Sequence, residues 1–121
     1  MRKLMVVKVI RNRAAINLIG LALKGGNAAV GRDSVRNALH RRRAVHLFLA
    51  ADAGNAVSGE MKALSEEHGV PFTVLGNKQA LGGALGRMEV AVVAITDPGL
   101  AEAICEATAR NGRNSGEDAA L

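Results

Sequence analysis

Two nearly continuous apolar runs limit the folds that are open to this sequence. Val45–Ala51 and Val90–Ile95 each have the length of a strand and lack regular polar alternation. A half-exposed strand would alternate, so we expect each run to form a strand that is covered on both faces. A chain of 121 residues suits one domain and can bury such a core without metal or disulfide staples.

Helical patterns alternate with these strands. A first helix contains apolar positions from Ile16 to Leu23 and is closed by Gly25-Gly26, and a second, over Arg32–Arg43, is opened by Gly31. The other expected elements are an extended piece at Ala28–Val30, a helix at Asn55–His68 stopped by Gly69, a strand at Val70–Leu75, a short helix at Lys78–Leu85 and a last helix from Asp97-Pro98 to about Arg110. This order predicts an α/β domain with helices on both faces of a small sheet. We expect a basic extension over residues 1–13, a single domain over 14–110 and a disordered tail over 111–121.

Composition excludes several classes of protein. Trp and Tyr are absent, and Phe48 and Phe72 are the only aromatic residues, which argues against a binder that stacks single-stranded bases on aromatic platforms. The single cysteine, Cys105, rules out an internal disulfide and a cysteine-based zinc site. No apolar run approaches the length of a membrane span, and the first 13 residues do not read as a secretory signal. The cytoplasm is therefore the expected compartment.

Side chains for catalysis or metal binding are not grouped in the sequence. No two of His40, His46 and His68 have metal-ligand spacing, and Cys105 has no evident base partner. Glu66 and Glu67 are adjacent on a helix and point in different directions, so they do not form a catalytic pair. We expect no enzyme activity, no cofactor and no metal site.

Charge is distributed very unevenly along the chain. Residues 1–51 contain eleven lysines and arginines and one acid, Asp33, whereas residues 52–109 contain three basic residues and eight acids. Two interpretations fit this pattern. The basic half attracts a polyanion, or it is a solvated face that keeps the protein soluble.

The first candidate site is the start of the helix that follows Gly31. A helix amino terminus offers open backbone N–H groups and a partial positive charge, which favour a phosphate or a base edge. Arg32 and Arg36 are neighbours on one face, Asp33 and Asn37 are neighbours on the next, and Ser34 lies in the first turn. Arginine guanidiniums fit phosphates and guanine edges, so we favour a binding role for Arg32 and Arg36.

Arg41–Arg43 follow at the other end of that helix. They are either a second group of phosphate ligands or cations that complement the negative carboxyl end of the helix. From the sequence we slightly favour the second interpretation.

A glycine cluster, Gly82-Gly83 and Gly86, is the other candidate. Glycine-rich turns can hold a phosphate. This cluster does not follow the first strand, and no Gly-Lys-Ser/Thr is present, so close helix packing and a helix stop are the favoured interpretation.

Several segments, in this order, resemble a known family. They are Ile16–Ala22 (INLIGLA), Gly26–Gly31 (GNAAVG), Leu47–Asp52 (LFLAAD), Val70-Pro71, Leu81–Gly86 (LGGALG) and Val92–Gly99 (VVAITDPG). Together they resemble the ribosomal-protein superfamily of kink-turn RNA binders, of the archaeal large-subunit "seven-Ae" and eukaryotic "thirty-e" type, and in particular its bacterial YlxQ-like branch. The resemblance covers about residues 14–109. It implies a three-layer α/β/α sandwich with a four-stranded mixed sheet, and an RNA site where the second helix begins.

In the family that site reads Gly-x-Asn-Glu-x-x-Lys, where Asn and Glu contact guanines of sheared G·A pairs and Lys contacts the backbone. Here Gly31 is retained, Asp33 stands for Asn, Ser34 for Glu and Asn37 for Lys. An ionised Asp33 accepts hydrogen bonds but does not donate them. The resemblance implies that Arg32 or Arg36 replaces the phosphate contact of the missing lysine.

The resemblance also implies a second contact, an apolar loop before the last strand that packs on an extruded nucleotide. The matching residues are Arg87-Met88-Glu89-Val90. Met88 and Val90 are expected to serve the apolar role, and Arg87 to contact a phosphate. The alternative for Val90 is that it only begins the strand.

The sequence thus predicts a non-enzymatic, monomeric, cytoplasmic protein that binds structured RNA, with ribosomal or kink-turn-like RNA as the candidates and no membrane or small-molecule partner. The expected RNA ligands are Gly31, Arg32, Asp33, Ser34, Arg36, Asn37, Arg87, Met88 and Val90. The alternative is a protein-interaction module on the same fold that binds no RNA and works through the acidic stretch Asp52–Glu106.

Overall fold

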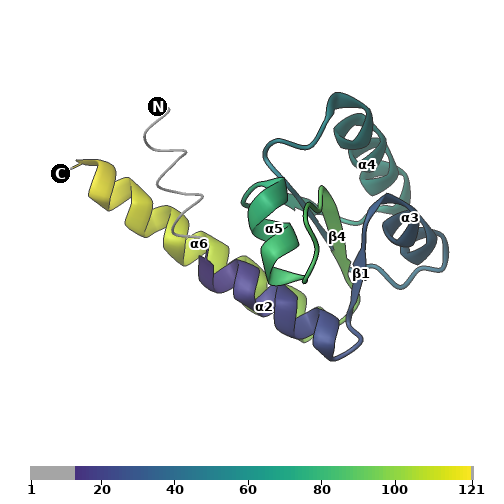
Figure 1. Ribbon diagram of the computed structural model, residues 1–121, viewed down its shortest axis with the longest axis horizontal. Helices are drawn as coiled ribbons and strands as arrows, with labels where there is room; N and C mark the ends of the chain where they lie inside the picture. Colours follow the sequence, from purple (N-terminus) through teal and green to yellow (C-terminus); the bar gives the residue numbers. More distant parts are fainter. Residues whose placement is uncertain (1–12, 121) are drawn as a thin grey trace.

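The computed structural model describes the backbone of residues 13–120 and the side chains of residues 13–109. Five helices and four strands occur in this part of the chain (Figure 1). In order they are α2 (Arg13–Lys24), β1 (Ala28–Val30), α3 (Arg32–His40), β2 (His46–Leu49), α4 (Asn55–His68), β3 (Phe72–Val74), α5 (Lys78–Ala84), β4 (Val92–Ile95) and α6 (Pro98–Ala120). The basic extension expected over residues 1–13 lies outside the described residues, except that Arg13 begins α2.

The four strands form one mixed sheet in the order β1-β4-β2-β3. β4 runs antiparallel to both of its neighbours, and Val93 lies opposite Val30 on one side and Phe48 on the other. β2 and β3 are parallel, as expected for strands joined by a crossover helix. The two apolar runs of the sequence therefore form the two central strands.

Alternate side chains of the central strands enter two separate cores. Phe48, Val93 and Ile95 pack with α2, α5 and α6 on one face of the sheet. Leu47 and Ala94 pack with α3 and α4 on the other face. Both faces are buried, because side chains alternate across a strand. The layers visible in Figure 1 confirm the three-layer α/β/α sandwich with a four-stranded mixed sheet.

Polar caps and glycines set several helix ends where the sequence predicts them. The Asp97 carboxylate accepts the Leu100 N–H at 2.8 Å at the start of α6, and Asn77 accepts the Ala80 N–H at 2.7 Å at the start of α5. Gly69 ends α4 with φ 67°, a left-handed conformation that suits glycine. These caps confirm the predicted boundaries.

Two helix ends differ from the prediction. α3 ends at His40 rather than Arg43, since Arg42 takes a positive φ of 58° that stops the helix. α6 continues through Ala120, where a disordered tail was expected from residue 111. No proline follows Pro98, so every residue of this stretch keeps the backbone N–H that a helix requires.

Within residues 13–120, no helix combines the length and the apolar character needed to cross a membrane.

Candidate nucleic-acid interface

The start of α3 is anchored to the first residue of the central strand β4. Gly31 has φ 93°, a conformation that side chains other than glycine rarely adopt, and its N–H donates to the Val92 carbonyl at 3.0 Å. No side chain caps α3. The first backbone N–H groups of the helix, after Gly31, are therefore open to an external acceptor such as a phosphate oxygen.

Arg32 and Arg36 do not present free guanidiniums, contrary to the prediction. The Arg32 Nε donates to Oε1 of Glu60 on α4, while Arg36 donates to Glu60 Oε2 through Nε at 2.9 Å and lies 2.8 Å from it through its second guanidinium nitrogen. Arg36 also donates to Asp33 Oδ1 at 3.0 Å. One carboxylate thus holds two arginines and ties α3 to α4.

The pKa values of this cluster reflect the same contacts. Hydrogen bonds from Arg32 and Arg36 lower the pKa of Glu60, and the hydrogen bond to Glu60 raises the pKa of Arg36. These contacts favour the charged forms of Glu60 and Arg36. Both arginines therefore have much of their charge balanced within the molecule.

The other predicted residues of α3 remain accessible. Asp33, Ser34 and Asn37 are exposed, and the Asp33 side chain is 94% exposed despite its contact with Arg36. Ser34 and Asn37 point into a single groove beside β1. They offer a hydroxyl and an amide, both of which donate and accept hydrogen bonds.

The segment before β4 is held against α5 by Gly82. A Cβ atom at Gly82 would lie 2.7 Å from the Met88 carbonyl oxygen and 2.8 Å from that of Arg87, so a side chain there would displace the segment. The Gly82 carbonyl also accepts the Arg87 N–H at 2.8 Å. The interpretation of this glycine as a packing residue is confirmed.

Met88 and Val90 have opposite environments. Met88 is 91% exposed, which leaves its side chain available to a partner. Val90 is only 4% exposed and packs in the core beneath α5. The predicted apolar contact is therefore possible for Met88 and not for Val90, whose side chain serves the core.

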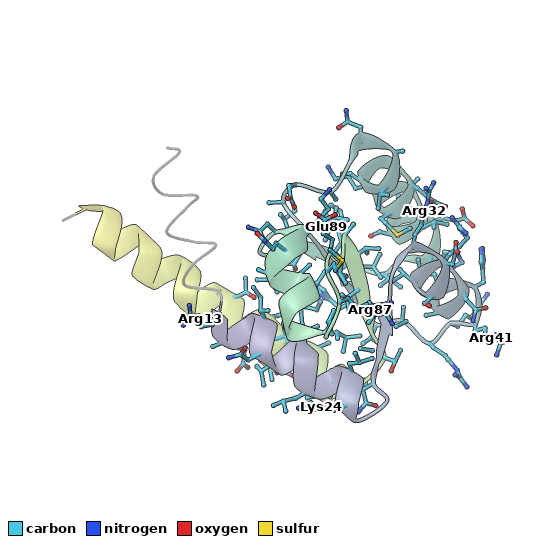
Figure 2. All side chains as sticks on the ribbon, viewed as in Figure 1. Arg13, Lys24, Arg32, Arg41, Arg87 and Glu89 are labelled. Atoms are coloured by element: carbon cyan, nitrogen blue, oxygen red, sulfur yellow. The ribbon has the colours of Figure 1, made fainter. Side chains whose placement is uncertain are left out.

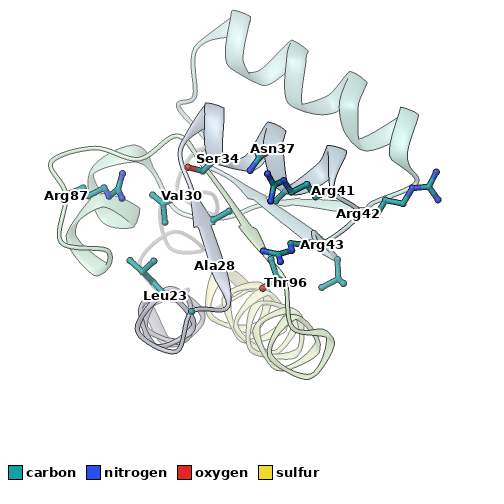
Figure 3. Close-up of a pocket in the computed structure, with 14 residues that line it drawn as sticks. Leu23, Ala28, Val30, Ser34, Asn37, Arg41, Arg42, Arg43, Arg87 and Thr96 are labelled. Carbon is teal, nitrogen blue, oxygen red and sulfur yellow. The ribbon is translucent and has the colours of Figure 1, made fainter.

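A groove of about 810 Å³ runs along α3 and β1 (Figure 3). Its lining brings together residues from α2, β1, α3, the loop after α3 and the segment before β4. These are Leu23, Gly26, Ala28, Ala29, Val30, Ser34, Asn37, Ala38, Arg41, Arg42, Arg43, Val45, Arg87 and Thr96. Four of them are arginines and none is acidic. Three predicted residues, Ser34, Asn37 and Arg87, therefore meet at one concave, basic surface.

Arg41–Arg43, which follow the end of α3, bring further positive charge to the groove. All three are exposed and line the groove, and none of them, nor Arg87, is ion-paired with a carboxylate among the side chains of residues 13–109. In Figure 3, Arg41 and Arg43 reach over the groove, whereas Arg42 extends away from them. Their run of three after the helix was the available signal.

The single cysteine packs against a histidine at the other face of the sheet. Cys105 Sγ lies 3.7 Å from both ring nitrogens of His46, whose Nε2 is 2.8 Å from Thr73 Oγ1. Burial raises the pKa of the Cys105 thiol and lowers the pKa of His46, so both groups are held neutral. Among the described residues, no three His, Cys, Asp or Glu side chains are placed to hold a metal ion.

The fold and the groove define a class of protein: an α/β/α sandwich with a concave basic surface at the edge strand β1. Residues 13–105 match the model of the ribosomal protein L7Ae/L30e/S12e/Gadd45 family. The chain belongs to this family.

Individual proteins are also similar to this chain in sequence or in structure. The chain is 29% identical over 84 residues to the RNA-binding protein YlxQ of Bacillus subtilis, covering 69% of this chain and 84% of the relative. A protein of unknown function from Bacillus halodurans has a similar structure, with a TM-score of 0.73 and 26% identity, covering 78% of this chain and 95% of that one. The 15.5 kD RNA-binding protein of Giardia lamblia shares the fold, with a TM-score of 0.65 and 22% identity over 78% of this chain and 82% of that one.

Proposed function

We propose that this protein binds structured RNA of the kink-turn type through the start of α3 and the segment before β4. The observation that carries the proposal is the meeting of Ser34, Asn37 and Arg87 in one groove without an acidic lining residue. Membership of the family and the name of the YlxQ relative support RNA as the partner. The proposed ligands are Gly31, Asp33, Ser34, Asn37, Arg87 and Met88.

Each group has a chemical part in this proposal. The open N–H groups of α3 and the Arg87 guanidinium hold phosphates. Asp33 accepts hydrogen bonds from a guanine edge, and Ser34 and Asn37 donate or accept there. Met88 provides apolar surface for a nucleotide that leaves the stack. Asp33 lacks the amide donor of the Asn in the family motif, and Ser34 is shorter than the Glu. We therefore expect weaker discrimination among bases than the family motif gives.

A binding titration tests the site. The full chain is titrated with a kink-turn RNA and with the same RNA in which Watson–Crick pairs replace the G·A pairs. The unmodified protein is expected to prefer the kink-turn, and Ser34→Ala with Asn37→Ala is expected to remove the preference, at about 1–3 kcal/mol for the base contacts that these side chains make. Equal affinity of the unmodified protein for both RNAs would contradict kink-turn recognition. No binding to any RNA at low salt would favour the protein-interaction alternative.

The proposal extends to the biological setting. We propose a non-enzymatic, monomeric protein in the cytoplasm, with ribosomal RNA as the first target to examine. Crosslinking in cells followed by sequencing of the bound RNA is the measurement. Recovery of ribosomal segments that carry a kink-turn would support this target.

A further inference from the structure

We propose that the carboxyl end of α3, with Arg41, Arg42 and Arg43, is a second contact for the backbone of the same RNA. This inference rests on the proposed function and extends it along the groove. Asp33 and Ser34 lie at the start of α3 and Asn37 lies one turn before Arg41, while the three arginines follow the other end of the helix. Figure 2 shows how far Arg32 and Arg41 are separated along this helix. The second contact would thus engage a different stretch of the bound chain.

The lining of the groove selects a phosphodiester chain as the occupant. Arg87 approaches from the segment before β4, and Arg41 and Arg43 approach from the loop after α3 (Figure 3). The floor between them is made of small side chains from β1 with Ser34, Asn37 and Thr96. Guanidinium forks match phosphate oxygens, and a groove without carboxylates does not repel them.

The helix end itself does not need these arginines. The N–H groups of Arg41, Arg42 and Arg43 donate to the carbonyls of Asn37, Leu39 and Ala38 at 2.9–3.0 Å. This pattern is a Schellman motif, in which the backbone satisfies the last carbonyls. The three side chains are therefore not required as hydrogen-bonding caps, and their guanidiniums remain available to a ligand in the groove.

Arg42 adds a separate observation. It has φ 58° at the position of the motif that glycine normally occupies. A side chain there costs backbone strain, which a glycine would avoid. Strain held beside a groove is consistent with a functional side chain. Arg42 also borders the small cavity between α3 and α4, which Glu67 lines as well.

Salt-dependent binding of the full chain tests the inference. The variant Arg41→Gln with Arg43→Gln is compared with Arg13→Gln with Lys62→Gln, which removes two exposed charges away from the groove. The probe is the kink-turn RNA. Because the groove variant can no longer make two of the phosphate contacts, it should bind about ten-fold more weakly, and its log–log salt slope should fall by about 1.4–1.8. The control variant should keep the slope of the unmodified protein.

A backbone contact also predicts equal losses on different RNAs. The groove variant should weaken binding to the kink-turn RNA and to its Watson–Crick counterpart by the same factor. If the unmodified protein binds RNA and the groove variant matches the control in affinity and slope, the inference is wrong and the proposed function stands. If the unmodified protein binds no RNA, both fail. Circular dichroism of each variant confirms that it is folded.

Discussion

At the amino end of α3, Arg32 and Arg36 share one carboxylate, whereas at its carboxyl end Arg41–Arg43 line an open groove. The two sets have the same side chain and belong to the same short segment of the chain. Their difference comes from ion pairing with α4: Glu60 is paired with the first set, whereas no described carboxylate is paired with the second. Net charge in a sequence therefore does not measure the charge that a partner meets.

The groove that Arg41–Arg43 line also contains Arg87, and Gly82 packs against the segment that carries Arg87. Gly82→Ala is expected to destabilise the protein by about 1–3 kcal/mol, since the new Cβ overlaps the carbonyls of Arg87 and Met88. The variant should also weaken RNA binding, because Arg87 moves from the groove. Urea unfolding and RNA titration measure the two effects.

Gly83→Ala is the matched control. It lies in the same helix, and a Cβ there would meet no atom within 4 Å. It should stabilise the protein by up to about 1 kcal/mol, through the higher helix propensity of alanine. If Gly83→Ala destabilised the protein as much as Gly82→Ala, the close contact at Gly82 would not be the cause of the loss.

Much of the fold follows from local patterns. The runs Val45–Ala51 and Val90–Ile95 contain β2 and β4, because a strand buried on both faces needs apolar residues at every position. Asp97 and Gly69 marked helix ends through capping chemistry that depends on few neighbours. These features depend on short segments of the sequence, so they can be predicted without knowing the contacts made by the rest of the chain.

The site was less predictable, because it depends on contacts between distant segments. Glu60 is 28 residues from Arg32 and lies on a different helix, and no spacing rule connects them. Val90 had two predicted roles, an apolar RNA contact or the start of a buried strand, and its packing beneath α5 shows that its side chain is in the core. Arg41–Arg43 do end α3, but the sequence could not show that they line one groove with Arg87, which lies more than 40 residues away along the chain.

Substitutions of Arg42, at the carboxyl end of α3, distinguish an effect on the free energy of unfolding from an effect on RNA binding. Arg42→Gly relieves the positive φ and is expected to raise the free energy of unfolding by about 1 kcal/mol, while it weakens RNA binding. Arg42→Ala removes the same charge and keeps the strain, so it should weaken binding equally without the gain in stability. A glycine variant that was stabilised and bound RNA normally would show that Arg42 is not a ligand.

Arg32 and Arg36, which are paired with Glu60, should contribute little to RNA binding. Arg32→Gln with Arg36→Gln removes two positive charges, yet the salt slope of RNA binding should remain close to that of the unmodified protein, since Glu60 already occupies both guanidiniums. The thermal midpoint should fall modestly, because the tie between α3 and α4 is removed. A slope that fell by as much as in the Arg41→Gln, Arg43→Gln variant would show that RNA displaces Glu60 and recruits both arginines.

The smallest expected effect is the pH dependence of the Glu60 cluster. Hydrogen bonds from Arg32 and Arg36 hold the pKa of Glu60 below its usual value, so the folded protein binds that proton less readily than the unfolded chain does. The stabilisation from Glu60 is therefore complete above about pH 4.3, the ordinary glutamate value, and is lost as the pH falls through the lowered pKa. Urea unfolding of the unmodified protein and of Glu60→Gln measures it: the difference in stability should be constant near neutral pH and shrink in acid. Carboxylates ordinarily titrate above about pH 2. If the difference persisted unchanged to that pH, packing of the Glu60 side chain, and not its charge, would join α3 to α4. The electrostatic contrast between the two ends of α3 would then have no basis.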